Sequence, residues 1–287
     1  MEYEPDQRHA EIIVASMNLS NANGVTTPGS HSSEVYVGDE EHLRGHEATL
    51  FRALAARANY LGQDRPDIQF AAKEIARKMS SPTQGDWAKL KRLARYLKSN
   101  LRYVHQFRWQ STNKINVYTD SDYAGCRSMR KSTSGGLMLL GGHLVRSWSS
   151  TQAIIATSSG EAEYYGIVKA GSVGLGAQSM LSDLGREMEV VILTDSSAAK
   201  AIASRTGLGK VRHIDVHYLW IQEIVKKRGV QIKKVDGKLN PADLLTKHLS
   251  RECLDRCLMR ENVSKRDGRS ALLPAISDQL FVSNSAE

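Results

Sequence analysis

The chain has 287 residues, a formal net charge of +8 and three cysteines. This length allows two modest domains, or one domain with extensions. No apolar run approaches the roughly 18 to 20 residues of a membrane-spanning helix, and the first residues lack the basic-then-apolar layout of a signal peptide. Three cysteines fit neither a disulfide framework nor a zinc knuckle. We therefore expect an intracellular protein, cytoplasmic or nuclear, without membrane contact.

Charge is unevenly distributed along the chain. Residues 1–43 hold eight acidic residues and one basic residue, and we interpret them as an acidic linker. Residues 44–109 hold fourteen basic and five acidic residues. Such a concentration of positive charge is typical of a surface that binds a polyanion, although solvated helix faces give the same pattern. Residues 251–287 are charge-balanced, and we expect a flexible tail there.

Apolar residues recur at helical spacing between residues 47 and 99, which predicts three helices within a small, mostly helical region over residues 44–110. Proline at Pro66 and Pro82 suits helix starts. The third helix places Trp87 and Leu90 on one stripe, and its other face carries Lys89, Arg92 and Arg95. The simple interpretation is a helical bundle with a basic exterior, and the functional interpretation is a clamp that follows a phosphate backbone.

The pattern changes from helical to extended near residue 111. NVYTDSD, SGGLMLLGG and HLVRSWSS predict three short strands joined by turns. A long helix is expected from Ser159 to Leu184, followed by strand VVILTD, helix SSAAKAIASR, helix VRHIDVHYLWIQEIVKK, strand VQIKKV and a last helix from Asn240. The order predicts an α/β domain over residues 111–250, with a mixed five-stranded sheet: an antiparallel meander extended by two parallel strands.

Four acidic residues stand at the places where this domain could bring carboxylates together. Asp120 and Asp195 end short β-branched runs, while Glu163 and Asp243 open stretches of helical spacing. Phosphodiester hydrolysis can use two divalent cations about 3.5–4 Å apart, held by clustered carboxylates. Glu161 competes with Glu163, but we expect it to act as a helix-start acid that interacts with the helix dipole. For any single acid, a solvated or capping carboxylate is the simpler interpretation.

The local sequence around these acids resembles the ribonuclease H of copia-type retrotransposon polyproteins. The strongest match is YTDSDYAGCRSMRKSTSGGLMLLGGHLVRSWSSTQAIIATSSGEAEYYG, and VRHIDVHYLWIQE and LNPADLLTK also match. The basic helical region is similar to the thumb and connection of the same family's reverse transcriptases. The resemblance covers about residues 5 to 250. The polymerase centre is absent, since the sequence contains no Asp-Asp pair.

The resemblance implies a ribonuclease H-like fold and a metal-dependent endonuclease that cuts the RNA strand of RNA–DNA hybrids. It implies two Mg²⁺ ions, with Mn²⁺ as the alternative. Asp120 would bridge both ions, Glu163 and Asp195 would hold the ion nearer the leaving group, and Asp243 would hold the ion that activates water. The implied partners are the hybrid duplex and the rest of a reverse transcriptase polyprotein.

The missing polymerase centre and one departure from the family pattern favour an alternative, a non-catalytic nucleic-acid-binding remnant: Ser150 and Thr151 stand where the family often has a basic residue. The VDGKLNPAD loop also lacks the histidine of cellular ribonucleases H. The resemblance implies slower or partner-dependent turnover there, because copia-type enzymes commonly lack this histidine too. A ribonuclease H-like integrase is a third interpretation. We rank it last, because the acidic residues of integrases lie in different local sequences. At the start of the expected helix VRHIDVHYLWIQEIVKK, the residues suited to contact nucleic acid are Lys210, Arg212 and His213. His213 and His217 have zinc-like spacing, but a third ligand is missing from the pattern.

Overall fold

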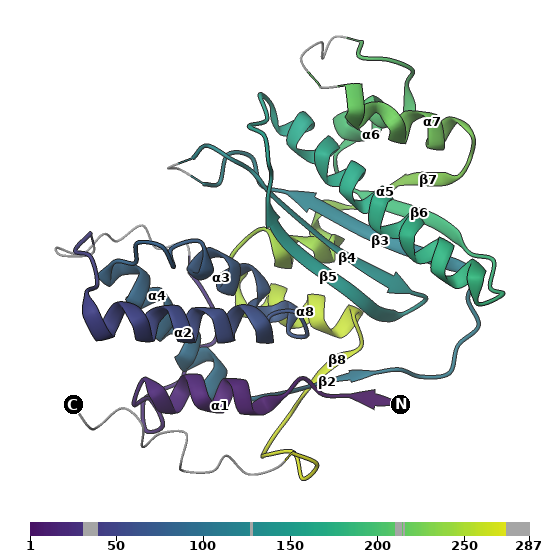
Figure 1. Ribbon diagram of the computed structural model, residues 1–287. Helices are drawn as coiled ribbons and strands as arrows, with labels where there is room; N and C mark the ends of the chain where they lie inside the picture. Colours follow the sequence, from purple (N-terminus) through teal and green to yellow (C-terminus); the bar gives the residue numbers. More distant parts are fainter. Residues whose placement is uncertain (31–39, 127–128, 210–213, 215, 274–287) are drawn as a thin grey trace. The chain divides into compact units, whose positions relative to one another are not determined.

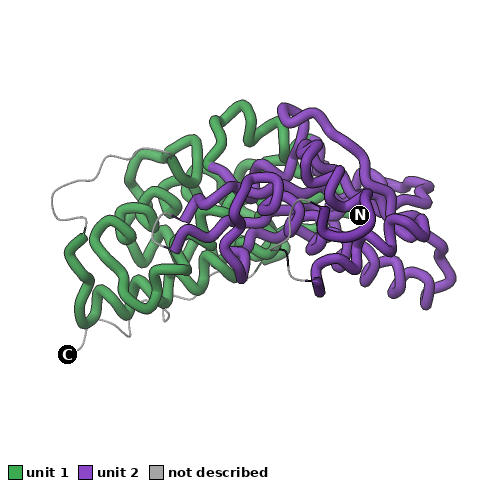
Figure 2. The backbone as a smooth tube through the Cα atoms, turned by 90° about the horizontal axis from the view of Figure 1, so that it is seen from above, with its two compact units in different colours: residues 1–106, 248–259, 263–287 green, residues 107–247, 260–262 purple. Residues whose placement is uncertain are grey.

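The computed structural model describes residues 1–30, 40–126, 129–209, 214 and 216–273. The chain forms two compact units, which are coloured separately in Figure 2. Unit 1 contains residues 1–106, 248–259 and the C-terminal segment from residue 263, and unit 2 contains residues 107–247 and 260–262. The helices and strands of both units are labelled in Figure 1.

Unit 1 combines helices with a three-stranded sheet. Its helices are α1 (Gln7–Ser16), α2 (Gly45–Leu61), α3 (Pro66–Ala76), α4 (Gln84–Ser99) and most of α8 (Arg251–Arg260). Its strands are β1 (Glu2–Tyr3), β2 (Arg102–Gln106) and β8 (Val263–Arg266), and both neighbours of the central β2 run antiparallel to it. The three helices expected between residues 47 and 99 are present, whereas the sequence did not indicate the sheet. Helix α1 lies within the segment that we interpreted as a linker.

The start of α4 shows why its sequence folds as a helix. Thr83 accepts a hydrogen bond from the backbone of Asp86, and the Asp86 side chain accepts one from the backbone of Thr83. This reciprocal pair satisfies two backbone donors that would otherwise lack partners at a helix start. Leu90, Leu93 and Leu97 then recur on one face and are fully buried. The helical spacing in the sequence therefore identifies the face that packs into the core of unit 1.

A buried ion pair links α3 to the end of α4 inside unit 1. Arg65 Nε and Nη2 lie 2.8 and 2.7 Å from the two carboxylate oxygens of Asp67. Tyr96 donates its hydroxyl to Asp67 at 2.9 Å, and Arg65 also donates to the carbonyl of Asn100 at 2.9 Å. Burial lowers the pKa of Arg65, but the charge and hydrogen bonds of Asp67 more than offset this and leave the pKa raised. The guanidinium therefore stays charged within the core.

Unit 2 contains a mixed five-stranded sheet in the order β5-β4-β3-β6-β7. Strands β3 (Lys114–Ser121), β4 (Thr133–Leu140) and β5 (His143–Thr151) form an antiparallel meander. Strands β6 (Glu189–Thr194) and β7 (Val230–Lys234) extend it in parallel. This is the α/β architecture and strand order that the sequence predicts, and it is the ribonuclease H-like arrangement that the resemblance implies.

Helix α5 (Ser159–Asp183) lies across one face of this sheet (Figure 1). The core between them contains Ile115 and Val117 of β3, Ile192 of β6 and Ile167 of α5, all at most 1% exposed. Helices α6 (Ser197–Ser204) and α7 (Trp220–Lys226) follow, and α7 is preceded by a short 3₁₀ helix, η1 (Val216–Leu219). The same layer of apolar side chains thus fixes α5 over the strands that carry two of the predicted acids.

The last part of unit 2 is made of two short 3₁₀ helices, η2 (Gly237–Leu239) and η3 (Pro241–Leu245). The expected helix from Asn240 is therefore only a short 3₁₀ turn in the structure. Asn240 caps η3 through its side-chain oxygen and donates from its side-chain nitrogen to the carbonyl of Thr119, at 3.0 Å. This contact ties η3 to the end of β3. Among the described residues, no helix has the length and apolar character needed to cross a membrane.

Candidate active site

Asp120 and Asp195 lie next to each other because their strands are parallel neighbours. Asp120 is the last residue but one of β3, and Asp195 directly follows β6. The register pairs Tyr118 of β3 with Leu193 of β6, so both strands end at the same edge of the sheet. Carboxyl ends of parallel strands are the usual place for ligand sites in α/β sheets. Two acids that each stand at the end of a predicted strand are therefore brought together at one edge of the sheet.

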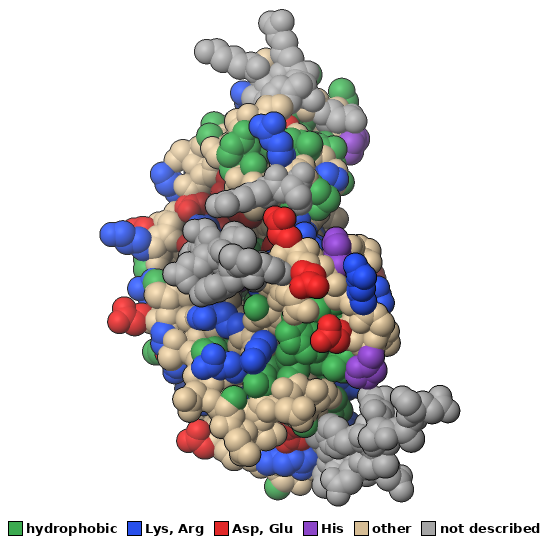
Figure 3. Space-filling view, turned by 90° about the vertical axis from the view of Figure 1, so that its left-hand side faces the viewer, with side chains coloured by type: hydrophobic (Ala, Val, Ile, Leu, Met, Phe, Trp, Pro, Cys, Tyr) green, Lys and Arg blue, Asp and Glu red, His purple; other side chains and the backbone are tan. Residues whose placement is uncertain are grey.

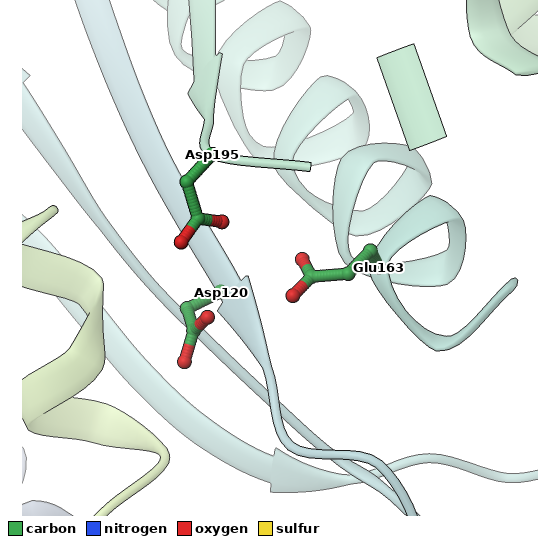
Figure 4. Close-up of side chains that lie close together, drawn as sticks. All are labelled: Asp120, Glu163 and Asp195. Atoms are coloured by element: carbon green, nitrogen blue, oxygen red, sulfur yellow. The ribbon is translucent and has the colours of Figure 1, made fainter. Parts of the chain in front are cut away.

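Glu163 reaches the same place from the first turns of α5, as Figure 4 shows. The neighbouring acid, Glu161, has a different role, since it accepts hydrogen bonds from the Thr157 backbone at 2.8 Å and the Tyr165 hydroxyl at 2.6 Å. Ser158 caps the helix by accepting from the Glu161 backbone at 3.2 Å. Glu161 is thus used in the helix start, as expected, and Glu163 is left to face Asp120 and Asp195.

Two glycines allow the segments that carry the acids to approach β3 closely. A Cβ atom at Gly166 of α5 would lie 2.8 Å from Thr119 Oγ1 and 2.9 Å from Ser121 Oγ. A Cβ atom at Gly135, the β4 residue paired with Asp120, would lie 2.7 Å from a methyl carbon of Thr246. Real side chains almost never make such short contacts. Glycine is therefore needed at both positions for α5 and η3 to lie close to Asp120.

Three carboxylates converge tightly at this edge. Asp120, Glu163 and Asp195 each offer one oxygen atom, and these three atoms lie within 4.8 Å of one another. Burial, followed by the charges of Asp120 and Asp195, raises the pKa of Glu163 to about 9. Burial and the charge of Asp120 likewise raise the pKa of Asp195. Crowded, desolvated carboxylates disfavour the ionised form unless a positive charge compensates them.

The donor set suits a divalent cation. All three groups are carboxylates, which are the hard oxygen ligands that Mg²⁺ prefers. Glu163 Oε2 is buried and accepts no hydrogen bond from any residue that the structure describes. An unpartnered buried carboxylate oxygen costs free energy, and a bound cation would remove that cost. The residues present therefore fit the metal that the fold family implies.

The fourth predicted acid, Asp243, lies beside this group but is paired with a lysine. Lys247 Nζ lies 2.9 Å from Asp243 Oδ1 and 3.5 Å from Asp120 Oδ2. The Thr246 hydroxyl also donates to Asp120 Oδ2. Burial and the charge of Asp120 raise the pKa of Asp243 to about 6, although Lys247 opposes the shift. The structure thus brings three of the four acids into one cluster and pairs Asp243 with Lys247, which also contacts Asp120.

Sequence reasoning missed Lys247. The available signal was its position four residues after Asp243, the spacing at which an acid and a base meet on a helix. Burial lowers the pKa of Lys247, but Asp120 and Asp243 raise it by more, so the pKa lies above its ordinary value. The ammonium is therefore charged at neutral pH and touches two of the predicted site carboxylates.

A second lysine, Lys169 of α5, lies beside Ser150, one of the two positions where the family often has a basic residue. Its Nζ donates to the Ser150 hydroxyl at 2.5 Å and lies 5.9 Å from the centre of the Trp148 ring. Burial lowers the pKa of Lys169. A cation is thus present beside Ser150, although it comes from the helix instead of the strand end. A search along the strand sequence alone could not find it.

The basic face predicted on α4 is used largely within unit 1. Lys89 forms an ion pair with Asp86 at 2.9 Å. Arg92 donates to the Thr27 hydroxyl at 2.9 Å, and Arg95 donates to the carbonyl of Asn23 at 2.7 Å. In Figure 3, Lys and Arg side chains lie among Asp and Glu side chains on the face drawn. Nucleic-acid contact by Lys89, Arg92 and Arg95 stays a prediction, and these internal contacts weigh against it.

Three further predicted contact residues, Lys210, Arg212 and His213, lie outside the described residues. Their role in binding nucleic acid therefore also stays a prediction. The loop before them is held by Gln222, which donates to the carbonyl of Ile202 at 2.9 Å and accepts from the backbone of Gly207 at the same distance.

Comparison with known proteins finds similar sequences among retroelement proteins. No family model matches it. It is 29% identical over 258 residues to the retrovirus-related Pol polyprotein from transposon TNT 1-94 of Nicotiana tabacum, a match that covers 88% of this chain and 19% of that protein. It is 28% identical over 263 residues to the corresponding polyprotein from transposon RE1 of Arabidopsis thaliana, covering 90% of this chain and 18% of that protein. The chain therefore spans about a fifth of the length of these relatives.

Solved ribonuclease H structures also align with the chain. One is the LC11 ribonuclease H1 isolated from compost, which is 20% identical and covers 51% of this chain and 99% of that chain, with a TM-score of 0.35. The chain is thus similar in sequence to part of retrovirus-related Pol polyproteins, and its second unit has a ribonuclease H-like fold.

Proposed function

We propose that unit 2 is a metal-dependent endonuclease that hydrolyses the RNA strand of RNA–DNA hybrids. The observation that carries this proposal is the convergence of Asp120, Glu163 and Asp195 at the carboxyl ends of β3 and β6, with ligand oxygens within 4.8 Å of one another. Three carboxylates at this distance repel one another and need a cation. The substrate class is supported by the resemblance of the surrounding sequence to retroelement ribonucleases H and by the Pol polyprotein relatives.

The residues would divide the work as follows. Asp120, Glu163 and Asp195 would hold one Mg²⁺, and Asp120 with Asp243 would hold a second. Bound divalent cations supply the acidity that makes a water molecule nucleophilic and the positive charge that neutralises a leaving oxygen. The chain itself helps to position these ligands, because Asn240 anchors the turn that carries Asp243 to β3.

Selectivity for a hybrid would come from the sugars of the two strands. The shallow minor groove of an A-like duplex displays 2′-hydroxyl groups, which a protein can read on the RNA strand. Contacts to phosphates would add affinity that falls steeply with salt concentration. We therefore expect binding to be salt-sensitive and cleavage to be confined to the strand that carries 2′-hydroxyl groups.

The test is cleavage of an RNA–DNA hybrid labelled on one strand at a time, in Mg²⁺ and in EDTA. Wild type should cut the RNA strand only in Mg²⁺. Asp120→Asn should lower the rate on the order of 10³-fold or more, because it removes the carboxylate common to both cations. The matched control is Asp183→Asn, which makes the same charge change at an exposed position at the end of α5. It should cut like wild type.

Two outcomes would contradict the proposal. Equal cleavage by wild type and Asp120→Asn would place any nuclease activity elsewhere. Salt-sensitive binding of the hybrid without cleavage by either protein would instead favour the alternative, a nucleic-acid-binding remnant of a retroelement polyprotein.

A further inference from the structure

Lys247 contacts both carboxylates that the proposed function assigns to a second cation. Its ammonium lies 2.9 Å from Asp243 Oδ1 and 3.5 Å from Asp120 Oδ2. A metal ion shared by these two carboxylates would lie between the same pair of oxygens. The three-carboxylate cluster of Asp120, Glu163 and Asp195 does not include Asp243.

The contact differs from an ordinary surface ion pair. Exposed lysine–carboxylate pairs contribute little, because water screens them and the long side chain loses freedom. Here one partner, the Asp120 side chain, is only 3% exposed, and the lysine contacts two carboxylates at once. An ammonium is a compact point charge with three donors and no acceptor. It can therefore replace the positive charge of a metal ion between two carboxylates, although it supplies one charge where Mg²⁺ supplies two.

The surroundings keep Lys247 in this position. Lys247 follows Asp243 by four residues and lies just after η3, and its backbone donates to the Asp243 carbonyl at 3.0 Å. Thr246, the preceding residue, donates its hydroxyl to the same Asp120 oxygen that faces the ammonium. The close approach of Thr246 to Gly135 fixes this segment against β4. At the same time the Lys247 side chain is 41% exposed, so a path for the ammonium to leave exists.

We propose that Lys247 is a built-in counter-cation that occupies the second metal position. The chain then binds one divalent cation at Asp120, Glu163 and Asp195, and it admits a second between Asp120 and Asp243 only when the Lys247 ammonium moves out. This inference rests on the proposed function, since it concerns the same carboxylates. It adds that the two cation positions differ in affinity and names the residue responsible.

The test is equilibrium binding of Mn²⁺ to the whole chain, measured by counting free Mn²⁺ with electron paramagnetic resonance. Wild type should bind one ion strongly and a second weakly. Lys247→Gln should tighten the weak step about tenfold, because it removes a positive charge from the position that the second ion takes. Lys247→Arg, which keeps the charge, should resemble wild type. Lys226→Gln makes the same charge change at an exposed position on α7 and should also resemble wild type.

Thermal unfolding in EDTA shows whether each variant is folded, and Lys247→Met replaces Lys247→Gln if the glutamine variant is not. Two results would overturn the role of Lys247: a weak step unchanged by removing its charge, or loss of the strong step when that charge is removed. The Asp120→Asn variant separates this failure from failure of the proposed function. If Asp120→Asn leaves the strong step intact, the cluster itself is not the metal site, whatever Lys247 does.

Discussion

Each unit of the molecule buries a group of charged side chains, and the two groups are balanced differently. In unit 1, Arg65 and Asp67 are 1% and 4% exposed, and each carboxylate oxygen of Asp67 accepts a hydrogen bond from the guanidinium. In unit 2, Asp120 is 2% exposed and faces Glu163 and Asp195, which carry the same sign of charge. In the first group, the charge of Asp67 is neutralised by Arg65. In the second group, Lys247 neutralises only part of the negative charge of the carboxylates.

This difference distinguishes a structural cluster from a functional one. A buried ion pair whose hydrogen bonds are satisfied needs nothing from outside, and breaking it leaves an uncompensated charge. A buried group of like charges destabilises the fold until a cation or protons compensate it. Strongly shifted pKa values in such a place indicate a functional site. The raised pKa values of Glu163, Asp195 and Asp243 therefore have a different meaning from the raised pKa of Arg65.

The largest effect on stability is expected from breaking the balanced cluster. Arg65→Met should lower the free energy of unfolding by about 3–5 kcal/mol, because Asp67 would remain buried without its partner. Urea unfolding measures the loss, and hydrogen exchange of the α3 and α4 amides locates it in unit 1. Arg44→Met, at an exposed position, is the matched control and should change little. A loss as small as that of the control would mean that the buried pair is not needed for the stability of unit 1.

Mg²⁺ should stabilise unit 2 by removing the repulsion among its carboxylates. A ligand that binds only the folded state at 100 times its dissociation constant adds about 2.7 kcal/mol. Thermal unfolding with Mg²⁺ and with EDTA measures the gain, which Asp120→Asn should abolish. A gain of the same size in Asp120→Asn would show that the ion acts somewhere else.

The metal-free protein should lose stability as pH rises, and Glu163 should account for part of the loss. Its pKa is raised from 4.5 to about 9, so the folded chain retains a proton that the unfolded chain releases. That stability is fully present below pH 4.5 and disappears as pH rises toward about 9. Glu163→Gln should therefore flatten the pH profile in EDTA and be more stable than wild type at pH 8, by on the order of 1 kcal/mol. Parallel profiles for the two proteins would contradict this explanation.

The smallest effect is expected on the basic face of α4. Arg95→Ala should cost about 0.5–1.5 kcal/mol through loss of its hydrogen bond to the Asn23 carbonyl. Hybrid affinity should change little, because this guanidinium is already used within unit 1. Lys91→Ala, at an exposed position on the same helix, is the comparison. Binding measured over a range of salt concentrations would support the clamp interpretation instead if Arg95→Ala lowered affinity more than Lys91→Ala.

Local patterns in the sequence predicted most of unit 2. The strands next to Asp120 and Asp195 carry alternating and β-branched apolar residues, and parallel pairing then brings the ends of these strands together. The separation of Glu161 from Glu163 was also predictable, because an acid in the first turn of a helix has capping partners nearby. These features depend on contacts between residues that are close in sequence or on the rule of strand pairing.

Other features depend on contacts that no local pattern encodes. The sheet of unit 1 joins β1, β2 and β8, which come from distant parts of the chain and are too short to show alternation. Helical spacing identified the basic face of α4, but it could not show that the segment around Asn23 covers it. The contact of Lys247 with Asp120 likewise depends on the approach of η3 to β3, which only the folded chain shows.

The most direct test of the central claim is anomalous diffraction from crystals of the whole chain grown with Mn²⁺. We predict an anomalous peak held by carboxylate oxygens of Asp120, Glu163 and Asp195, and its absence in crystals of Asp120→Asn. A cluster without a peak at saturating Mn²⁺, or a peak that persists there in Asp120→Asn, would contradict the claim that these buried carboxylates form a metal site.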